Sequence, residues 1–174
     1  MHRCRICGQT YLGSEAPSHC PFCGAHRELI VDAAMYPEDI NTVQLTEIER
    51  TDLDTAVELE RSNARFYLAM AQRGDNPGLA NAFKRLAAVE TEHCSLFCRL
   101  STQPKPADLR EPGEELGSWE ADIDESARRE HRASDLYAEF AGRATSPRLS
   151  EVWTAVSAIE ADHIELDALA KLYV

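Results

Sequence analysis

The chain has 174 residues, of which 44% are hydrophobic, and this composition is sufficient to bury an ordinary globular core. It carries 18 Lys and Arg residues against 30 Asp and Glu residues, which gives a formal net charge of −12. Because such an excess of acid repels the phosphate backbone, nucleic-acid binding is excluded. No apolar run approaches the roughly 18 residues of a membrane helix, and the opening MHRCRICG lacks the apolar core of a secretory signal. We therefore expect a cytoplasmic protein that binds neither nucleic acid nor a membrane.

Four of the six cysteines fall in the first 23 residues, as two Cys-x-x-Cys pairs separated by twelve residues. The first pair is Cys4 and Cys7, and the second is Cys20 and Cys23; a glycine follows each pair. In a reducing compartment this spacing indicates a metal site rather than a disulfide framework. Four thiolates are expected to surround one metal ion tetrahedrally. Two metals remain open: zinc, which is structural and redox-inert, and iron, which carries one electron.

The composition divides the chain into two unequal parts. Residues 1–30 hold three arginines against two glutamates, a net charge of +1, so the remainder carries −12 − 1 = −13. After residue 30 the cysteines nearly stop, and residues 31–50 are predicted to form a linker. An apolar period of 3.6 residues then begins, so residues 51–174 are predicted to form a larger helical domain.

Four helices are predicted in the larger part, over residues 52–73, 77–100, 118–143 and 147–172. Each is preceded by a polar residue able to cap its N-terminus, namely Thr51, Asn76, Ser118 and Ser146. Short loops make the first two and the last two helices antiparallel neighbours, whereas residues 101–117 form a long, proline-rich connection. One long crossover is typical of ferritin-like bundles. The predicted fold class is therefore all-α, a ferritin-like four-helix bundle preceded by a small four-cysteine metal module.

The second helical pair repeats the first at an offset of 70 residues. The repeat aligns apolar and aromatic residues such as Tyr67 with Tyr137 and Phe83 with Trp153. It also aligns three pairs of polar residues, which are Glu60 with Glu130, Glu90 with Glu160, and His93 with His163. The bundle is thus predicted to be a duplicated helical hairpin.

These polar residues interrupt the apolar, core-facing stripes of the four predicted helices. Buried without compensation, each charge would cost on the order of several kcal/mol. Two divalent cations supply +4 against the −4 of four carboxylates, and oxygen-rich ligands with one imidazole per metal suit iron or manganese. A Glu from each of two helices and a Glu-x-x-His from each of the other two is the ligand set of dimetal carboxylate bundles. The sequence matches this set at Glu60, Glu90, His93, Glu130, Glu160 and His163.

Other residues near the predicted site admit two interpretations. Tyr67 and Tyr137 each lie seven residues after a ligand glutamate, so they could hydrogen-bond a ligand carboxylate or be ordinary core tyrosines. Asp167, four residues after His163, could orient a ring nitrogen or be exposed. Two further cysteines are predicted to be small buried residues at a helix contact, Cys94 and Cys98. No ligand role is assigned to the remaining histidines, His2, His19, His26 and His131.

The combination of these motifs resembles the rubrerythrin family. The segment CxxCG, a twelve-residue gap and CPxCG is of the rubredoxin type, and it is joined to a bundle with a duplicated Glu…Glu-x-x-His pattern. In typical rubrerythrins the rubredoxin-like module follows the bundle, so this chain is similar to a reverse rubrerythrin. The resemblance implies one iron at the four cysteines (or zinc, as above) and two irons at the six bundle ligands. Many rubrerythrins carry an additional glutamate one turn after the third-helix ligand; Ala133 stands at this place, which argues against a redox-linked ligand shift.

The resemblance also implies a function. The protein would be a non-haem di-iron peroxidase that reduces hydrogen peroxide to water in oxidative-stress defence, with electrons relayed through the rubredoxin-like iron. An external donor, such as an NAD(P)H-dependent reductase or rubredoxin, would supply them. A homodimer is implied, in which the module of one chain reaches the di-iron centre of the other. The catalytic residues would be the six bundle ligands together with Tyr67 and Tyr137.

Two alternatives remain. A ferroxidase or iron-handling ferritin-like protein would oxidise iron that then leaves the site, although such a protein needs no electron-carrying module. A non-enzymatic binding module would hold zinc at the four cysteines and use the dimetal centre only to stabilise the bundle.

Overall fold

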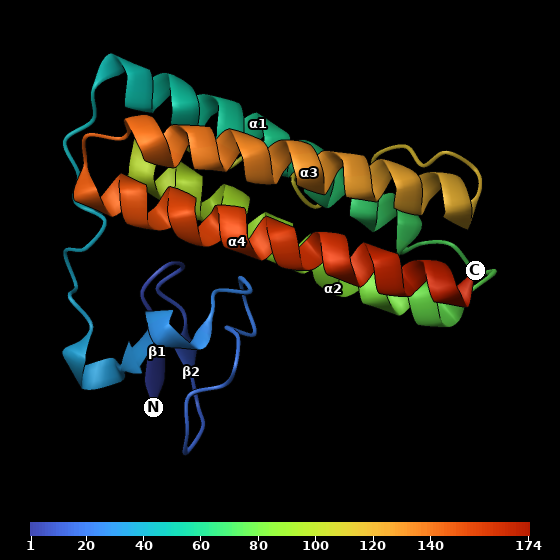
Figure 1. Cartoon of the computed structure of the whole chain (residues 1–174), viewed down its shortest axis with the longest axis horizontal. Coiled ribbons are helices and arrows are strands. Elements are labelled where there is room, and N and C mark those ends of the chain that lie inside the picture. The colour runs from blue at the N-terminus through green and yellow to red at the C-terminus, as the bar shows by residue number, and fades with distance from the viewer.

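The computed structural model describes all of residues 1–174 and consists of a small N-terminal module beside four long helices (Figure 1). The helices, in chain order, are α1 Glu47–Met70, α2 Pro77–Ser101, α3 Trp119–Arg143 and α4 Pro147–Ala170. The predicted ferritin-like four-helix bundle is confirmed. None of these helices combines the length and the apolar character needed to cross a membrane.

The N-terminal caps of α2, α3 and α4 are those predicted, because the side chains of Asn76, Ser118 and Ser146 each accept a backbone hydrogen bond. The predicted start of the first helix is wrong. Thr46 caps α1, and its side chain and that of Glu49 form a capping box, so the helix begins five residues earlier than expected. Thr51 lies inside the helix and donates its hydroxyl to the carbonyl of Glu47.

The helix ends also differ from the prediction by a few residues. The first helix ends at Met70 rather than 73, and α4 ends at Ala170 rather than 172 because the chain tightens into a 3-10 turn over Lys171–Tyr173. The second helix ends one residue late, at Ser101, where Thr102 adopts a left-handed conformation with φ of 58°.

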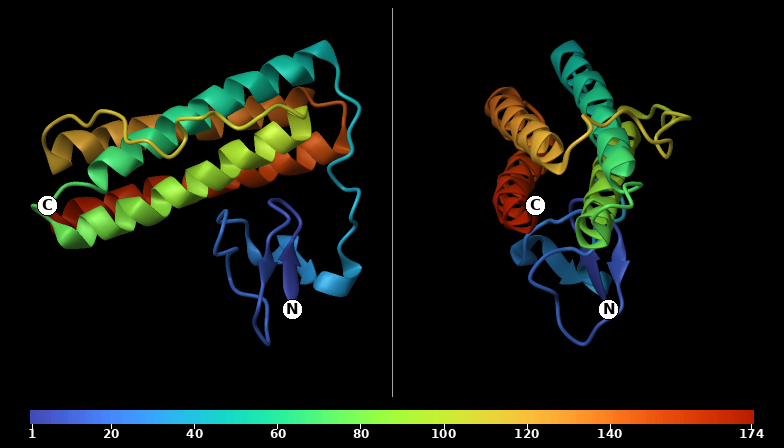
Figure 2. Two further views of the ribbon diagram at one scale, coloured as in Figure 1. Left: turned by 180° about the vertical axis from the view of Figure 1, so that it is seen from behind. Right: turned by 90° about the vertical axis from the view of Figure 1, so that its right-hand side faces the viewer.

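The long crossover between α2 and α3 is present and runs back along the outside of the bundle (Figure 2). Its middle is held to α1 by charge, because Arg61 and Arg65 both donate to the carboxylate of Asp108. Backbone contact adds to this, since the Gly113 amide donates to the Arg65 carbonyl at 2.8 Å. The crossover makes α1 and α3 antiparallel, so the two hairpins face each other across the bundle (Figure 1).

The N-terminal module is built on a small antiparallel sheet of three strands in the order β2-β1-β3. Its strands are β1 His2–Cys4, β2 Thr10–Tyr11 and β3 Ile30–Asp32. The third strand continues past the predicted domain boundary at residue 30 and is followed by a 3-10 turn over Ala33–Met35. Part of the segment predicted as a linker therefore belongs to the module.

The module packs against α2 and α4 of its own chain (Figures 1 and 2). Arg148 of α4, 8% exposed, donates to the carbonyls of Arg5 at 2.7 Å and Ile6 at 3.1 Å. Arg99 of α2 donates to the carbonyl of Cys7 at 2.8 Å. These two guanidinium groups satisfy backbone carbonyls around the first cysteine pair and hold that pair against the helices.

The apolar core of the bundle is divided in two. One cluster is centred on Phe97, Tyr137 and Trp153 and is continuous with the module, while the other contains Phe83 and Trp119. Because the 70-residue repeat pairs Phe83 with Trp153, corresponding residues of the two hairpins lie in opposite clusters. The predicted polar ligands belong to neither cluster.

Candidate metal centres

The four cysteines of the module converge on one point. Cys4 Sγ lies 3.7 Å from Cys23 Sγ, and Cys7 Sγ lies 3.7 Å from Cys20 Sγ. A disulfide would need about 2.05 Å, whereas four sulfurs about 2.3 Å from a central metal form a tetrahedron with edges of roughly 3.8 Å. All four residues are buried. The cluster therefore fits one tetrahedral iron or zinc ion.

Two glycines shape the turns that present these sulfurs. Gly8 and Gly24 have φ of 75° and 77°, a conformation that costs other residues about 1–2 kcal/mol. Each donates its amide to the carbonyl of the first cysteine of its pair, at 2.9 Å. Gly24 is needed for a second reason, because a Cβ at this position would lie 2.9 Å from Ile159 Cγ2 of α4. The second cysteine turn thus approaches the bundle more closely than any side chain there would permit.

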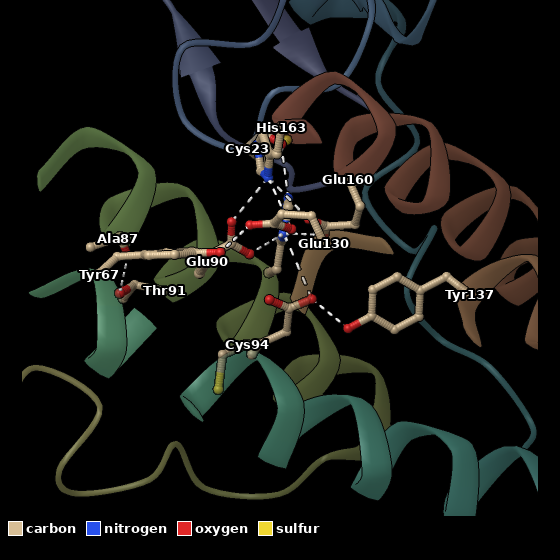
Figure 3. Close-up of polar contacts among 12 residues, drawn as sticks. Cys23, Tyr67, Ala87, Glu90, Thr91, Cys94, Glu130, Tyr137, Glu160 and His163 are labelled. Atoms are coloured by element: carbon tan, nitrogen blue, oxygen red, sulfur yellow. Dashed lines mark hydrogen bonds and ion pairs between the residues drawn. The ribbon is translucent and has the colours of Figure 1, made fainter. Parts of the chain in front are cut away.

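The six predicted bundle ligands also converge, and none of them is more than 4% exposed. They form two overlapping sets whose ligand atoms lie within 4.8 Å of one another. One set contains Glu60 and His93, the other contains Glu130 and His163, and both contain Glu90 and Glu160. Figure 3 shows the labelled carboxylates and His163 pointing toward one another between the helices. The geometry is that of two adjacent metal positions with two shared carboxylates.

The unpartnered oxygens of this cluster test whether it fits metal ions. One oxygen of each of the four glutamates is buried without a hydrogen-bond partner. Each histidine turns Nδ1 toward the shared carboxylates, at 3.2 Å from Glu90 Oε2 for His93 and 3.0 Å from Glu160 Oε2 for His163. Such buried acceptors are costly unless cations are bound to them. The residues present therefore fit two divalent ions, and carboxylates with one imidazole per ion suit iron.

The electrostatics of the cluster favour bound positive charge. Burial, together with the neighbouring carboxylates, raises the pKa values of Glu60 and Glu130 well above the ordinary value. Burial opposes a charge on the histidines, but the surrounding glutamates prevail and raise the pKa values of His93 and His163. The pKa shifts of the glutamates and of the histidines have the same cause, which is that four carboxylates are confined in a space without water.

Two tyrosines support the outer glutamates from opposite sides (Figure 3). The hydroxyl of Tyr67 on α1 donates to Glu130 on α3, and the hydroxyl of Tyr137 on α3 donates to Glu60 on α1. Both phenols are fully buried. Of the two interpretations, the structure supports hydrogen bonding to a ligand carboxylate, and each bond joins one hairpin to the other.

The two histidines differ in what lies behind their rings. His93 Nε2 donates to the carbonyl oxygen of Cys23 at 2.9 Å, which leaves Nδ1 free to bind a metal. His163 lines instead a groove of about 790 Å³ between α2 and α4, with mainly apolar side chains such as Phe83 and Ile159. His93 thus contacts the cysteine module directly, whereas His163 faces a groove that His19 and Gly24 of the module also line.

Asp167 is placed at the groove end. The exposed interpretation is wrong, because this residue is 1% exposed. It lines the groove beside His163, and one of its oxygens has no hydrogen-bond partner. Burial raises the pKa of Asp167 to about 7, against the opposing effects of Ser126 and His163. The repeat places Phe97 at the corresponding position of the other hairpin, so only the His163 end of the dimetal site has this additional carboxyl group.

The remaining candidates fall outside the two clusters. Cys94 and Cys98 are buried, Cys94 Sγ lies 3.7 Å from the Val57 carbonyl of α1, and burial raises the pKa of both thiols. They are residues of a helix contact, as predicted. His131 is exposed on α3. His19 and His26, which share no motif spacing, meet Asp162 of α4, and sequence periodicity contains no signal for this contact.

The fold and the two clusters define a class: a ferritin-like dimetal carboxylate bundle combined with a four-cysteine metal module. The family model for the rubredoxin-like domain of rubrerythrin matches residues 2–29, and the rubrerythrin model matches residues 52–117. The chain is 33% identical over 120 residues to Reverse rubrerythrin-1 of Clostridium acetobutylicum. That match covers 62% of this chain and 65% of the relative. No solved structure matches the chain significantly.

The chain therefore belongs to the rubrerythrin family. The order of the two matched domains, with the cysteine module first, is the order that the sequence analysis associated with reverse rubrerythrins. The predicted cofactors are confirmed at the level of fit, since the clusters suit a di-iron site and one iron or zinc ion.

Proposed function

We propose that this protein is a non-haem di-iron peroxidase that reduces hydrogen peroxide to water with electrons relayed through the four-cysteine iron. The observation that carries the proposal is the hydrogen bond of 2.9 Å between His93 Nε2 and the Cys23 carbonyl. It joins a residue of the bundle cluster directly to a residue of the cysteine cluster. A redox-inert module that served only as a staple would not need to contact a metal-binding histidine.

The ligands have distinct tasks under this proposal. Iron bound in the bundle supplies two electrons which, with two protons, convert one molecule of hydrogen peroxide into two of water. Glu90 and Glu160 would hold both ions, and each histidine would bind one through Nδ1. Tyr67 and Tyr137 hold the two outer carboxylates in position. The helices bury all four glutamates completely and so keep bulk water away from these carboxylates.

Electrons and substrate would enter at different ends of the site. Pro21 and Phe22, between the second pair of cysteines, are exposed, and this face of the module is available to an external donor. We propose an NAD(P)H-dependent reductase or rubredoxin as that donor. Hydrogen peroxide would approach through the groove between α2 and α4, on whose wall His163 lies.

The expected homodimer is also a proposal. In this structure the module contacts the bundle of its own chain, so the proposed electron route would not require a second chain. Exposed apolar side chains that follow α4 and lie outside the groove, Leu172 and Val174, support a second copy as a partner. Sedimentation velocity of the wild type and of Leu172→Asp tests this, and a wild-type monomer at micromolar concentration would contradict it. A cytoplasmic location and a role in oxidative-stress defence belong to the same proposal.

The experiment that tests the enzyme proposal follows the colour of the cysteine iron. Anaerobically reduced protein is mixed with one equivalent of hydrogen peroxide, and the visible ferric-thiolate band is recorded with time. We expect the band to return rapidly, faster than with oxygen, and not in Glu90→Ala. A protein with no colour in any state would hold zinc at the cysteines, which would overturn the relay. Faster return with oxygen and release of iron would favour a ferroxidase.

A further inference from the structure

Three side chains capable of binding metal meet at the junction between the module and α4. His19 and His26 face each other across an isolated antiparallel β-bridge, and their ring centroids lie 5.1 Å apart. Both rings turn Nε2 toward Oδ2 of Asp162 on α4, at 3.8 Å for His19 and 2.7 Å for His26. The ligand atoms of all three residues lie within 4.8 Å of one another.

The distances favour a shared ion over simple hydrogen bonding. His26 can donate to Asp162 at 2.7 Å, but His19 at 3.8 Å is too far from this oxygen for a hydrogen bond. A tetrahedral ion with bonds of about 2.0–2.1 Å holds its nitrogen and oxygen ligands roughly 3.3 Å apart. The two observed distances lie on either side of this value, so small side-chain rotations would bring both nitrogens into place.

The outer nitrogens of the two rings add a second observation. His19 Nδ1 lies 3.1 Å from the hydroxyl of Ser18, and His26 Nδ1 lies 3.8 Å from a carboxylate oxygen of Glu28. Histidines that bind metal through one nitrogen almost always present the other to an oxygen atom. His19 therefore has the full orientation of a ligand, with Nε2 toward the common point and Nδ1 hydrogen-bonded to Ser18, whereas His26 turns Nε2 toward the same point and its Nδ1 faces Glu28 from beyond hydrogen-bond distance.

We propose that His19, His26 and Asp162 bind one divalent transition-metal ion of the zinc class, with a water molecule as the fourth ligand. None of these residues belongs to the cysteine or carboxylate cluster. The site is reachable from solvent, since the side chains of His19 and Asp162 are 55% and 42% exposed. Because two ligands come from the module and one from α4, the bound ion would hold the second cysteine turn against the helix that carries His163.

Zinc itself is the probe for this site. The isolated protein, with its iron and zinc content measured beforehand, is titrated with Zn²⁺ by calorimetry and by equilibrium dialysis. We expect one additional zinc per chain with no loss of iron. His26→Ala, which removes a ligand, and Asp162→Asn, which removes its charge, should each weaken this binding by about tenfold or more, since even the loss of a residue that only supports a ligand costs about tenfold. His131→Ala, which removes an exposed histidine of α3, should bind zinc as the wild type does.

The design separates a lost site from a damaged module. The visible band of the cysteine site reports whether each variant keeps the folded module, and Asp162→Asn preserves the size of the side chain. Hydrogen exchange adds a local readout, because zinc should slow exchange over residues 18–26 in the wild type but not in Asp162→Asn. The proposal is overturned if the wild type takes up no additional zinc, if zinc enters only as iron leaves, or if both variants bind it with wild-type affinity.

Discussion

The two ends of the dimetal site have matching ligands and different surroundings. At one end, His93 contacts the Cys23 carbonyl, and Glu60 is held by Tyr137. At the other end, His163 lines the groove, and Glu130 is held by Tyr67. Duplication of a helical hairpin accounts for the matching ligands, because the repeat relates every pair at the same offset.

The difference between the ends arises outside the repeat. The cysteine module has no duplicate, so it covers one histidine and leaves the other beside the groove. Ser126 donates to Tyr67 at 3.2 Å and Asp167 lies nearby, whereas the repeat places Ala56 and Phe97 at the other end. A symmetric ligand set thus acquires one histidine covered by the module and one beside a groove through packing alone.

The largest expected effect comes from the carboxylates shared by the two ends. Glu90→Ala or Glu160→Ala should lose both bundle irons and lower peroxidase activity by at least about 100-fold, because each carboxylate belongs to both ligand sets. Iron analysis and the visible band check this, since the cysteine iron should remain. Glu139→Ala, an exposed glutamate of α3, is the control. Two bundle irons retained with full turnover would show that the ligand assignment is wrong.

Substitution of the two turn glycines tests the end that faces the module. Gly24→Ala and Gly8→Ala both cost about 1–2 kcal/mol of stability because of their positive φ. Only Gly24→Ala places a Cβ against α4, at 2.9 Å from Ile159, while that of Gly8→Ala lies 3.1 Å from the Tyr36 hydroxyl. Stopped-flow recording after addition of peroxide should therefore show a slower return of the visible band in Gly24→Ala alone. Equal rates in the two variants would contradict a route across this contact.

Substitution of the two tyrosines should show the difference between the ends of the dimetal site as a difference in protein stability. Tyr67→Phe and Tyr137→Phe each remove a hydrogen bond to a buried carboxylate, which should lower the free energy of unfolding by about 1.5–3 kcal/mol. Tyr67→Phe should cost about 0.5–1.5 kcal/mol more, because Ser126 loses its acceptor. Urea unfolding at matched iron content measures both values. A larger loss for Tyr137→Phe would contradict the prediction.

A further effect, which depends on pH, concerns the joint between the two hairpins. Glu49 of α1 accepts hydrogen bonds from Thr145 and Ser146 in the loop between α3 and α4. Burial opposes its charge, but these bonds and those from Thr46 lower the pKa of Glu49 to about 2. A lowered carboxyl pKa stabilises the fold above the unfolded value of about 4.3, and this stabilisation is lost as the pH falls toward 2.

Glu49→Gln tests this joint. The wild type should be more stable than the variant by about 2–3 kcal/mol at pH 6, and the difference should shrink as the pH falls from about 4.5 to 2. Unfolding curves recorded at several pH values measure it. Glu47→Gln, at an exposed residue of the same first turn, is the matched control. A constant difference between the wild type and Glu49→Gln would indicate that charge at this position is unimportant.

Most of the bundle was predictable from local signals. Asn76, Ser118 and Ser146 mark helix starts because a short polar side chain satisfies free amides of the first turn, which is a property of neighbouring residues. The start of α1 was missed although Thr46 and Glu49 have the spacing of a capping box, which is also a local signal. The second contact of Glu49, with a loop almost 100 residues away, has no local signal.

The sequence by itself determined which residues could bind metal. Helical periodicity places Glu90 and His93 on one face, and the cost of burying charge then requires cations beside them. The tertiary structure alone decided what surrounds each ligand. The contacts of His93 with Cys23 and of His26 with Asp162 join segments 70 and 136 residues apart, and no local pattern encodes them. Their physical origin is the packing of the module on α2 and α4, which gives two equivalent histidines different neighbours.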